Sequence, residues 1–247
     1  MPLPSGPAPP SYPRVLLVGD TGVLVELGGG IDPGVNARAL ALAAGLRELA
    51  LAGVRDVVPT YASVLVHLDP GTADQEAIAV TVSSLLERAG VPAPEGRAWR
   101  VPVAYGGEHG VDLAEMAGEK AIAEAELVRR HIAPTYRVYM IGFQPGFAYL
   151  GGLDPTLARS RRTDPRPRTP AGSVSIGGVQ TAVASVEAPS GWNLIGRTPA
   201  LPFRLGRDPV FLFRTGDTVR FEAIPGDVFL ALATRAAAGE LIAERLR

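Results

Sequence analysis

YMIGFQPGFAYLGGL, residues 139–153, contains no charged side chain, four glycines, one proline and four aromatic residues. It is shorter than the roughly 20 mostly apolar residues that cross a bilayer, and Pro145 disfavours a long helix. A glycine-rich bend lets a ligand or another chain approach the backbone closely. Phe143, Phe147 and Tyr149 would then provide apolar walls. The composition fits a small-molecule pocket and a buried turn of the core equally well.

An arginine-rich strip, RSRRTDPRPRTP, follows at residues 159–170. Its arginines lie close together in the sequence and are Arg159, Arg161, Arg162, Arg166 and Arg168. Prolines hold the strip extended, and guanidinium groups match the geometry of carboxylates and phosphates. A solvated basic loop would have the same composition. The uncharged aromatic segment beside the strip makes a pocket for a small anion at least as good an interpretation.

The composition of the chain narrows the classes of function. The 247 residues include 47% apolar residues and no cysteine, and the formal net charge is −1. This charge argues against binding to nucleic acid or to a membrane surface mainly by electrostatic attraction. The lack of cysteine excludes disulfides, thiolate nucleophiles and cysteine-bound metals. No membrane-spanning run or secretory signal is evident, so a cytoplasmic protein is expected.

Two residue types limit the chemistry further. Lys120 is the single lysine and lies outside any Gly-Lys-Ser/Thr motif, so the chain has no P-loop for ATP. The histidines, His67, His109 and His131, are far apart in the sequence, and no metal site is expected. His131 lies at the end of a predicted helix, where it would either favour the helix dipole or point into a site.

Hydrophobic periodicity divides the chain into two parts. Residues 1–13 are expected to be a disordered tail, and residues 14–90 read as ββαββα, a small α+β domain. Residues 91–97 are a predicted linker. From residue 98 to residue 247, short strands separated by turn residues favour a barrel or a sandwich. An amphipathic helix over residues 227–247 is expected to close the chain.

Three local signals add detail to this division. Asp32 and Pro33 are expected to begin the first helix, as cap and first-turn residue. The run VFLF at residues 210–213 reads as a strand. Ser173 lies in PAGSVSIGG, which is either an anion-binding turn of backbone N–H groups or the entry to a hairpin.

Several stretches together resemble one family: YMIGFQPGFAYLGGL, PRPRTPAGSVSIGG, QTAV, GWNLIGRTP and GDTVRF. The chain resembles the allophanate hydrolase subunit 1 family, over nearly its whole length after residue 14. This family is also called the KipI family or the family of B-type 5-oxoprolinase subunits (PxpB). The resemblance implies an α+β N-terminal domain followed by a mainly-β, cyclophilin-like barrel domain of the carboxyltransferase type. It also implies partners, which are the C-like and A-like subunits of the same system.

The activity implied by the resemblance is that of an ATP-dependent amidohydrolase subunit, foremost 5-oxoprolinase. That system converts 5-oxoproline, ATP and water to glutamate, ADP and phosphate. ATP, accompanied by Mg²⁺, would be used by the complex, and the isolated chain would be inactive. The family leaves two alternatives: a KipI-like inhibitor of a histidine kinase, and a subunit related to allophanate hydrolase or urea carboxylase.

The site expected from the resemblance combines the aromatic segment with the arginine strip. The expected substrate-binding residues are Phe143, Pro145, Gly146, Tyr149, Arg161, Arg166, Arg168, Ser173, Trp192 and Arg197. Arg166 or Arg168 would hold the substrate carboxylate or the phosphate of an acyl-phosphate intermediate. His131 would carry a proton, and Gln180 would hydrogen-bond the amide. Ser190 stands where the family usually has glycine and would be strained if that position requires a positive φ.

Overall fold

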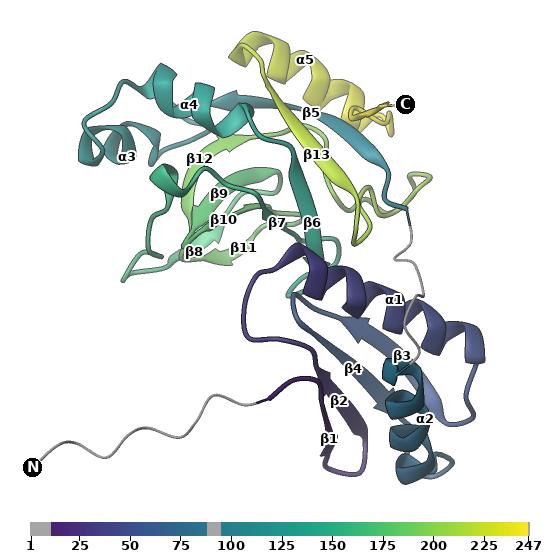
Figure 1. Cartoon of the computed structure of the whole chain (residues 1–247). Coiled ribbons are helices and arrows are strands. Elements are labelled where there is room, and N and C mark those ends of the chain that lie inside the picture. Colours follow the sequence, from purple (N-terminus) through teal and green to yellow (C-terminus); the bar gives the residue numbers. More distant parts are fainter. Residues whose placement is uncertain (1–10, 88–94, 247) are drawn as a thin grey trace, which may run out of the picture. The chain divides into compact units, whose positions relative to one another are not determined.

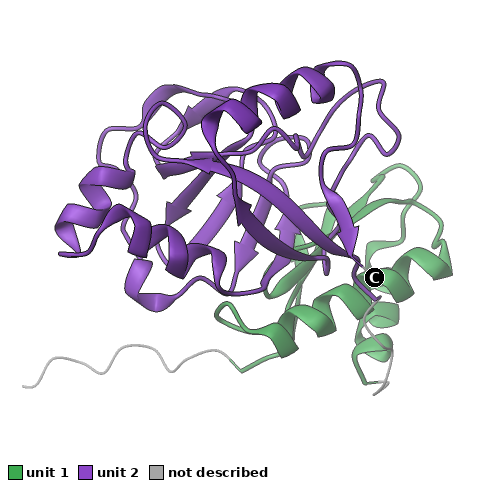
Figure 2. Ribbon diagram, turned by 90° about the horizontal axis from the view of Figure 1, so that it is seen from above, with its two compact units in different colours: residues 1–94 green, residues 95–247 purple. Residues whose placement is uncertain are grey.

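The computed structural model describes residues 11–87 and 95–246 of the chain. The chain divides after Pro94 into two compact units. Figure 2 shows the described residues of the first unit in green and those of the second in purple. The division falls within the predicted linker, residues 91–97. Most of that linker, and most of the predicted N-terminal tail, lie outside the described residues.

The first unit is a 4-stranded antiparallel sheet with two helices (Figure 1). Its elements are β1 Arg14–Val18, β2 Gly22–Glu26, α1 Pro33–Leu49, β3 Val54–Pro59, β4 Ser63–Leu68 and α2 Gln75–Glu87. The strands lie in the order β1-β2-β4-β3 across the sheet. Alternate residues of a strand face the same side, so Val23 and Val25 of β2 and Val64 and Val66 of β4 are buried together against leucines of α1.

Local signals set both ends of α1. Oδ1 of Asp32 accepts a hydrogen bond from the backbone N–H of Val35 at 2.8 Å, and Pro33 occupies the first turn. Both features confirm the prediction from the sequence. The helix ends at Leu49, because Ala50 takes a left-handed conformation with φ of 44°.

The second unit is built on a closed barrel of 7 strands (Figure 1). The ring follows the order β12-β9-β10-β7-β6-β13-β5, and the pairing of β12 with β5 closes it. The ring strands are β5 Ala98–Tyr105, β6 Tyr136–Ile141, β7 Ala148–Gly151, β9 Ser173–Gly177, β10 Gln180–Val183, β12 Asn193–Arg197 and β13 Thr218–Ala223. Strands β13 and β5 run parallel, and the other neighbours in the ring run antiparallel. The mainly-β second half predicted from the sequence is thus a barrel, not a sandwich.

Further elements surround this ring. They are α3 Leu113–Glu119, α4 Glu124–Ile132, the 3₁₀ turn η1 Pro155–Leu157, β8 Arg166–Thr169, β11 Ala188–Ser190, α5 Gly226–Ala237 and β14 Glu244–Leu246. Strands β8 and β11 pair only with each other, as a two-stranded ribbon. The barrel core contains Val101, Val103, Leu150, Ile176 and Ile195, all fully buried.

The end of the chain differs from the prediction. The helix expected over residues 227–247 stops at Ala237, and Gly239 follows it with φ of 98°. The last described residues instead form β14, which pairs with β5. The strand expected over residues 210–213 is also wrong: Phe211 makes an isolated bridge with Phe203, and no regular strand forms there.

A buried carboxylate fixes the start of β5 next to the start of β13. Asp217 is 1% exposed and accepts hydrogen bonds from the backbone N–H and the guanidinium of Arg97, from Nε1 of Trp99 and from the N–H of Arg214. The ion pair between Arg97 Nη2 and Asp217 Oδ2 measures 2.7 Å. These bonds tie together two strands that are far apart in the sequence and form the parallel pair of the ring.

We expect Asp217→Ala to lower the free energy of unfolding by about 3–5 kcal/mol, because it leaves a buried guanidinium and an indole N–H without their partner. Glu244→Ala removes an ion pair with Arg100 whose side chains are 60% and 47% exposed, so it should cost less than about 1 kcal/mol. Urea unfolding of both variants measures the difference. Equal losses would contradict this role of Asp217.

Candidate functional site

A pocket in the second unit brings the aromatic segment and the arginine strip together. Its volume is about 340 Å³. Four of the predicted substrate-binding residues line it: Phe143, Tyr149, Arg161 and Trp192. The remaining walls come from Phe147, from the strip, from β8 and β9, and from the segment around β11. The structure therefore favours the pocket interpretation of residues 139–153 over a wholly buried turn.

The aromatic side chains of the pocket meet edge to face. The ring centroids of Phe147 and Tyr149 lie 4.8 Å apart, and those of Phe147 and Trp192 lie 6.3 Å apart. Gly177 faces Trp192 so closely that an added Cβ would lie 2.5 Å from the indole. Phe143, at the opening, is 72% exposed and has a positive φ of 67°, an uncommon conformation for a residue other than glycine. The position of the indole thus depends on a glycine in the neighbouring strand.

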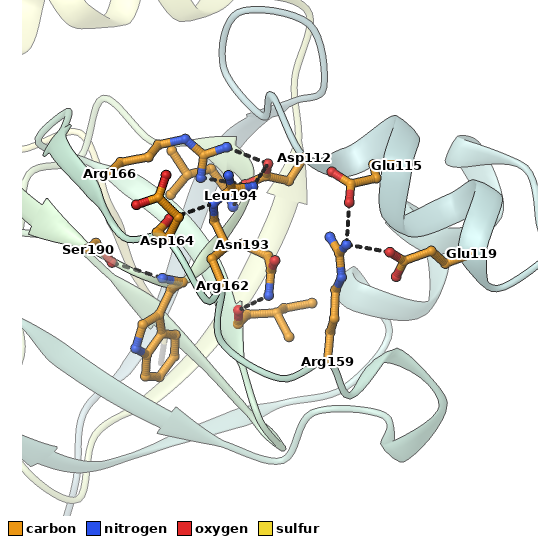
Figure 3. A network of polar contacts seen from close by, with 12 residues as sticks. Asp112, Glu115, Glu119, Arg159, Arg162, Asp164, Arg166, Ser190, Asn193 and Leu194 are labelled. Atoms are coloured by element: carbon orange, nitrogen blue, oxygen red, sulfur yellow. Dashed lines mark hydrogen bonds and ion pairs between the residues drawn. The ribbon is translucent and has the colours of Figure 1, made fainter.

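Asp112 anchors one end of the arginine strip (Figure 3). Its carboxylate is 2% exposed and accepts from both Nη atoms of Arg166, at 2.9 Å and 2.5 Å. The same carboxylate accepts from the backbone N–H of Leu194 at 2.6 Å, and Nη1 of Arg162 lies 3.5 Å away. Arg166, expected to hold a substrate carboxylate, is therefore already occupied by a carboxylate of this chain, and it does not line the pocket.

Two more arginines of the strip are also paired. Arg159 reaches Glu115 and Glu119 of α3 (Figure 3). Arg168 pairs with Glu187 at 3.0 Å, and both side chains are exposed to solvent. Neither arginine lines the pocket. The strip is thus held largely by carboxylates of its own unit.

Arg161 is the arginine of the strip that faces the pocket. Its guanidinium carbon lies 5.5 Å from the ring centroid of Trp192, within the range of a cation–π contact. Burial raises the pKa of the Tyr149 phenol, although Arg161 partly opposes this shift, so Tyr149 is a neutral donor or acceptor at physiological pH. The pocket therefore offers a positive group at one side of an aromatic wall.

His131, near the end of α4, is fully buried against β5 and β10 and does not line the pocket. Thr181 Oγ1 donates to the carbonyl of Ser175 at 2.9 Å, so it accepts from Nε2–H of His131 at 3.1 Å. Nδ1 of His131 then accepts from the hydroxyl of Tyr105 at 2.8 Å. Burial lowers the pKa of His131 to about 3. The imidazole is thus neutral and satisfied on both nitrogens.

The remaining predicted residues lie outside the pocket lining. Gln180 is half-buried on β10, opposite Gly177. Ser173 donates to the carbonyl of Pro170 at 2.7 Å, which is a turn contact. Arg197 donates to the carbonyl of Ala171 and lies 5.7 Å from the ring of Phe229 in α5.

Two members of the aromatic motif shape the loop without lining the pocket. Pro145 is exposed, and Gly146 has a positive φ of 77°. A Cβ on Gly146 would lie 2.9 Å from Cβ of Phe203, so this glycine permits close approach of two loops. The motif therefore sets the loop's backbone as well as supplying side chains.

Three polar residues that line the pocket were not among those predicted from the sequence: Gln144, Thr169 and Ser175. Thr169 and Ser175 are 3% and 4% exposed, and Oγ1 of Thr169 is buried without a hydrogen-bond partner. The position of Ser175 between the apolar residues Val174 and Ile176 was the available signal for it. Nothing in the sequence distinguishes Thr169 from an ordinary strand residue.

Ser190 adopts an unstrained conformation. It belongs to β11 and is not among the described non-glycine residues with positive φ. Its Oγ accepts from the backbone N–H of Trp192 at 3.2 Å. The serine therefore supports the turn that carries the indole, and the strain considered for this position does not occur.

Comparison with known proteins places the chain in a family. Residues 13–213 match the carboxyltransferase domain, subdomains C and D. The chain belongs to this family. It is 37% identical over 218 residues to the B-type subunit of 5-oxoprolinase from Bacillus subtilis, an alignment that covers 84% of this chain and 91% of that protein. The family resemblance recognised from the motifs is confirmed.

Solved structures share this fold. The crystal structure of TTHA0988 superposes with a TM-score of 0.74 at 34% identity, covering 83% of this chain and 40% of the TTHA0988 chain. This chain thus spans less than half the length of that protein. Urea amidolyase of Kluyveromyces lactis gives a TM-score of 0.78 at 18% identity, covering 95% of this chain and 16% of the other. At that identity the likeness concerns the fold alone.

The described ranges, residues 11–87 and 95–246, contain neither a candidate metal site nor a membrane-spanning helix. Within these ranges no group of His, Asp and Glu side chains is arranged to hold a metal ion. No helix in the same ranges combines the length and apolar character needed to cross a membrane.

The polar groups lining the pocket include the guanidinium of Arg161, the amide of Gln144 and several hydroxyls.

The neutral state of His131 predicts a dependence of stability on pH. The unfolded chain binds a proton at this residue near pH 6.5, whereas the folded chain binds it only near pH 3, so stability falls as pH falls through this window. Between pH 8 and pH 5 this residue should remove about 2 kcal/mol of folding free energy. Urea unfolding at both values, with His131→Phe for comparison, measures it.

The His131→Phe variant should lose less stability than the wild type between these pH values, by about the same 2 kcal/mol. In the folded wild type, the imidazole resonances of His131 should not shift between pH 8 and pH 5. Titration of His131 in that range by NMR would show that the ring is accessible to protons, contrary to its burial.

Proposed function

We propose that this chain is the B-type subunit of an ATP-dependent 5-oxoprolinase, which converts 5-oxoproline, ATP and water to glutamate, ADP and phosphate. The observation that carries the proposal is the 37% identity to the B-type 5-oxoprolinase subunit of Bacillus subtilis over 91% of that protein. A pocket whose size, aromatic walls and guanidinium suit a small cyclic acid supports it. The chain supplies part of a composite site, and A-like and C-like partners supply the rest.

ATP fits poorly in this pocket. A triphosphate carries several negative charges, whereas the pocket is lined by one arginine and by no lysine. The sequence also has no P-loop, because its single lysine, Lys120, follows Glu119 and donates to the carbonyl of Ala158. We therefore assign the binding of ATP and its Mg²⁺ to the partner proteins and the binding of the cyclic amide to this chain.

The pocket residues would bind and orient the substrate. Phe147 and Trp192 are each 6% exposed and form a rigid apolar wall that excludes water from one side of a bound ring. The phenol of Tyr149 remains protonated, because burial raises its pKa, and can donate to a carbonyl or carboxylate. His131 takes no part in proton transfer at the pocket, because its ring is buried elsewhere with both nitrogens occupied.

Filling the pocket tests the proposal. Ala188 lines the pocket in a half-buried position of β11, so Ala188→Phe should occupy the space of the substrate without disturbing the barrel. With its A-like and C-like partners, the wild-type chain should release glutamate only when both ATP and 5-oxoproline are present. We expect the variant complex to lose at least about tenfold in kcat/KM for 5-oxoproline, equivalent to about 1.4 kcal/mol.

Ala114→Phe is the matched control, because Ala114 is exposed on α3 and does not line the pocket. It should leave activity unchanged, and thermal unfolding should show that both variants are folded. Full activity of a folded Ala188→Phe complex would remove the pocket from the reaction. Failure of the wild-type complex to release glutamate, together with capture of a histidine kinase whose autophosphorylation it blocks, would favour an inhibitor instead.

A further inference from the structure

Arg161 is the arginine of the strip whose charge no carboxylate neutralises. Its neighbours Arg159, Arg162, Arg166 and Arg168 each form an ion pair, whereas Arg161 forms none within the described residues. Its contact with the indole ring holds the guanidinium in place, and an indole face accepts no conventional N–H hydrogen bond from it. The donors of Arg161 therefore remain available to a ligand, and the pocket offers a single uncompensated positive charge.

The pocket has a charged rim and an uncharged floor. Phe143, at the rim, is 72% exposed, and Arg161 is also exposed. Thr169, Ser175 and Trp192 are 3%, 4% and 6% exposed and therefore form the deep part of the lining. A ligand that pairs with Arg161 must consequently place its opposite end among hydroxyls and apolar surface.

The floor contains a hydroxyl that lacks a partner. Oγ1 of Thr169 is buried and makes no hydrogen bond within the described part of the chain. Buried hydroxyls nearly always have a partner, because an unmatched one loses its hydration without compensation. A hydroxyl both donates and accepts, so it matches the N–H or the C=O of an amide.

We infer that the pocket recognises a compact ring bearing one carboxylate and one uncharged amide, and that Arg161 and Thr169 determine this specificity. This inference deepens the proposed function and rests on it, because 5-oxoproline is such a molecule. The guanidinium of Arg161 donates to the carboxylate at the rim. The aromatic walls contact the ring, and the hydroxyls of Thr169 and Ser175 face the amide at the floor.

The same arrangement distinguishes substrate from product. Opening the lactam ring of 5-oxoproline turns the neutral amide into a second carboxylate and an ammonium group. The floor of the pocket is lined by no arginine, lysine or histidine, so a carboxylate placed there would be desolvated without a counter-charge. Glutamate therefore binds more weakly than 5-oxoproline, which favours release of the product.

Matched ligands separate the two halves of the recognition. 2-Pyrrolidinone keeps the lactam and lacks the carboxylate, whereas cyclopentanecarboxylate keeps the carboxylate and lacks the amide. We expect the wild-type chain to bind 5-oxoproline at least about tenfold more tightly than 2-pyrrolidinone, and about three- to tenfold more tightly than cyclopentanecarboxylate and glutamate. Isothermal titration measures these ratios, on the full chain alone and in its complex without ATP. Fluorescence of Trp192, one of 2 tryptophans, gives a second readout.

Two variants should each abolish one preference and retain the other. Arg161→Gln should bind 5-oxoproline and 2-pyrrolidinone with similar affinity while still preferring 5-oxoproline over cyclopentanecarboxylate. Thr169→Val should bind 5-oxoproline and cyclopentanecarboxylate with similar affinity while still preferring 5-oxoproline over 2-pyrrolidinone. It should not lower the melting temperature, because the hydroxyl it removes has no partner in the folded chain. Arg168→Gln is the control, because Arg168 pairs with Glu187 away from the pocket, and it should retain both preferences.

The outcomes distinguish this inference from the proposed function. Equal affinity of the wild type for the matched ligands, or retention of both preferences in folded Arg161→Gln and Thr169→Val, would overturn the inference. Binding with the expected preferences but without glutamate release by the complex would support the inference and contradict the oxoprolinase assignment. Glutamate release by the complex, with binding preferences unaltered in both variants, would support the oxoprolinase assignment and contradict the inference.

Discussion

The carboxylate of Asp112 is the constraint on which the pocket depends. It is almost fully buried at the start of α3, and it binds Arg166 of the ribbon, approaches Arg162 of the strip and accepts from the N–H of Leu194 in β12. Removing it would leave a guanidinium and a backbone N–H without their partner in a poorly hydrated place, which is far costlier than losing an exposed ion pair. One side chain thus joins the start of α3 to the arginine strip and to β12, two segments that are distant from it in sequence.

This constraint explains why a strip of five arginines offers only one positive charge to a ligand. The carboxylates of α3 neutralise the arginines that face the helix, while Arg168, on the solvent side of the ribbon, pairs with Glu187. The guanidinium of Arg161 instead lies over the indole of Trp192. A loop of free arginines would attract polyanions without discrimination, whereas one cation beside an aromatic wall suits a monoanion.

Much of the fold follows from local signals in the sequence, and the site follows only in part. Asp32 and Pro33 begin α1 as predicted, because capping depends on residues close in sequence. The helix α5 stops beside a local glycine, Gly239, that the expected helix over residues 227–247 passed over. The pairing of β14 with β5 depends on a strand more than a hundred residues away, which periodicity does not reveal. The convergence of Tyr149 with Arg161 was predicted from their proximity in sequence. The capture of Arg166 by Asp112, and the burial of Thr169, required the tertiary structure.

In the second unit, the buried ring of His131 is hydrogen-bonded on both nitrogens, whereas the ribbon of β8 and β11 carries an unpartnered hydroxyl. A neutral His131 near the end of α4 links Tyr105 of β5 to Thr181 of β10. Both nitrogens of its ring are satisfied, so these contacts form a rigid part of the core. Outside the ring, β8 and β11 pair only with each other and leave Thr169 unsatisfied beside an open pocket. Unsatisfied polar groups beside a cavity mark where a fold accepts a ligand, because the ligand supplies the missing bond. The site therefore lies on the ribbon side of the barrel, and the imidazole that the sequence suggested as catalytic belongs to the scaffold.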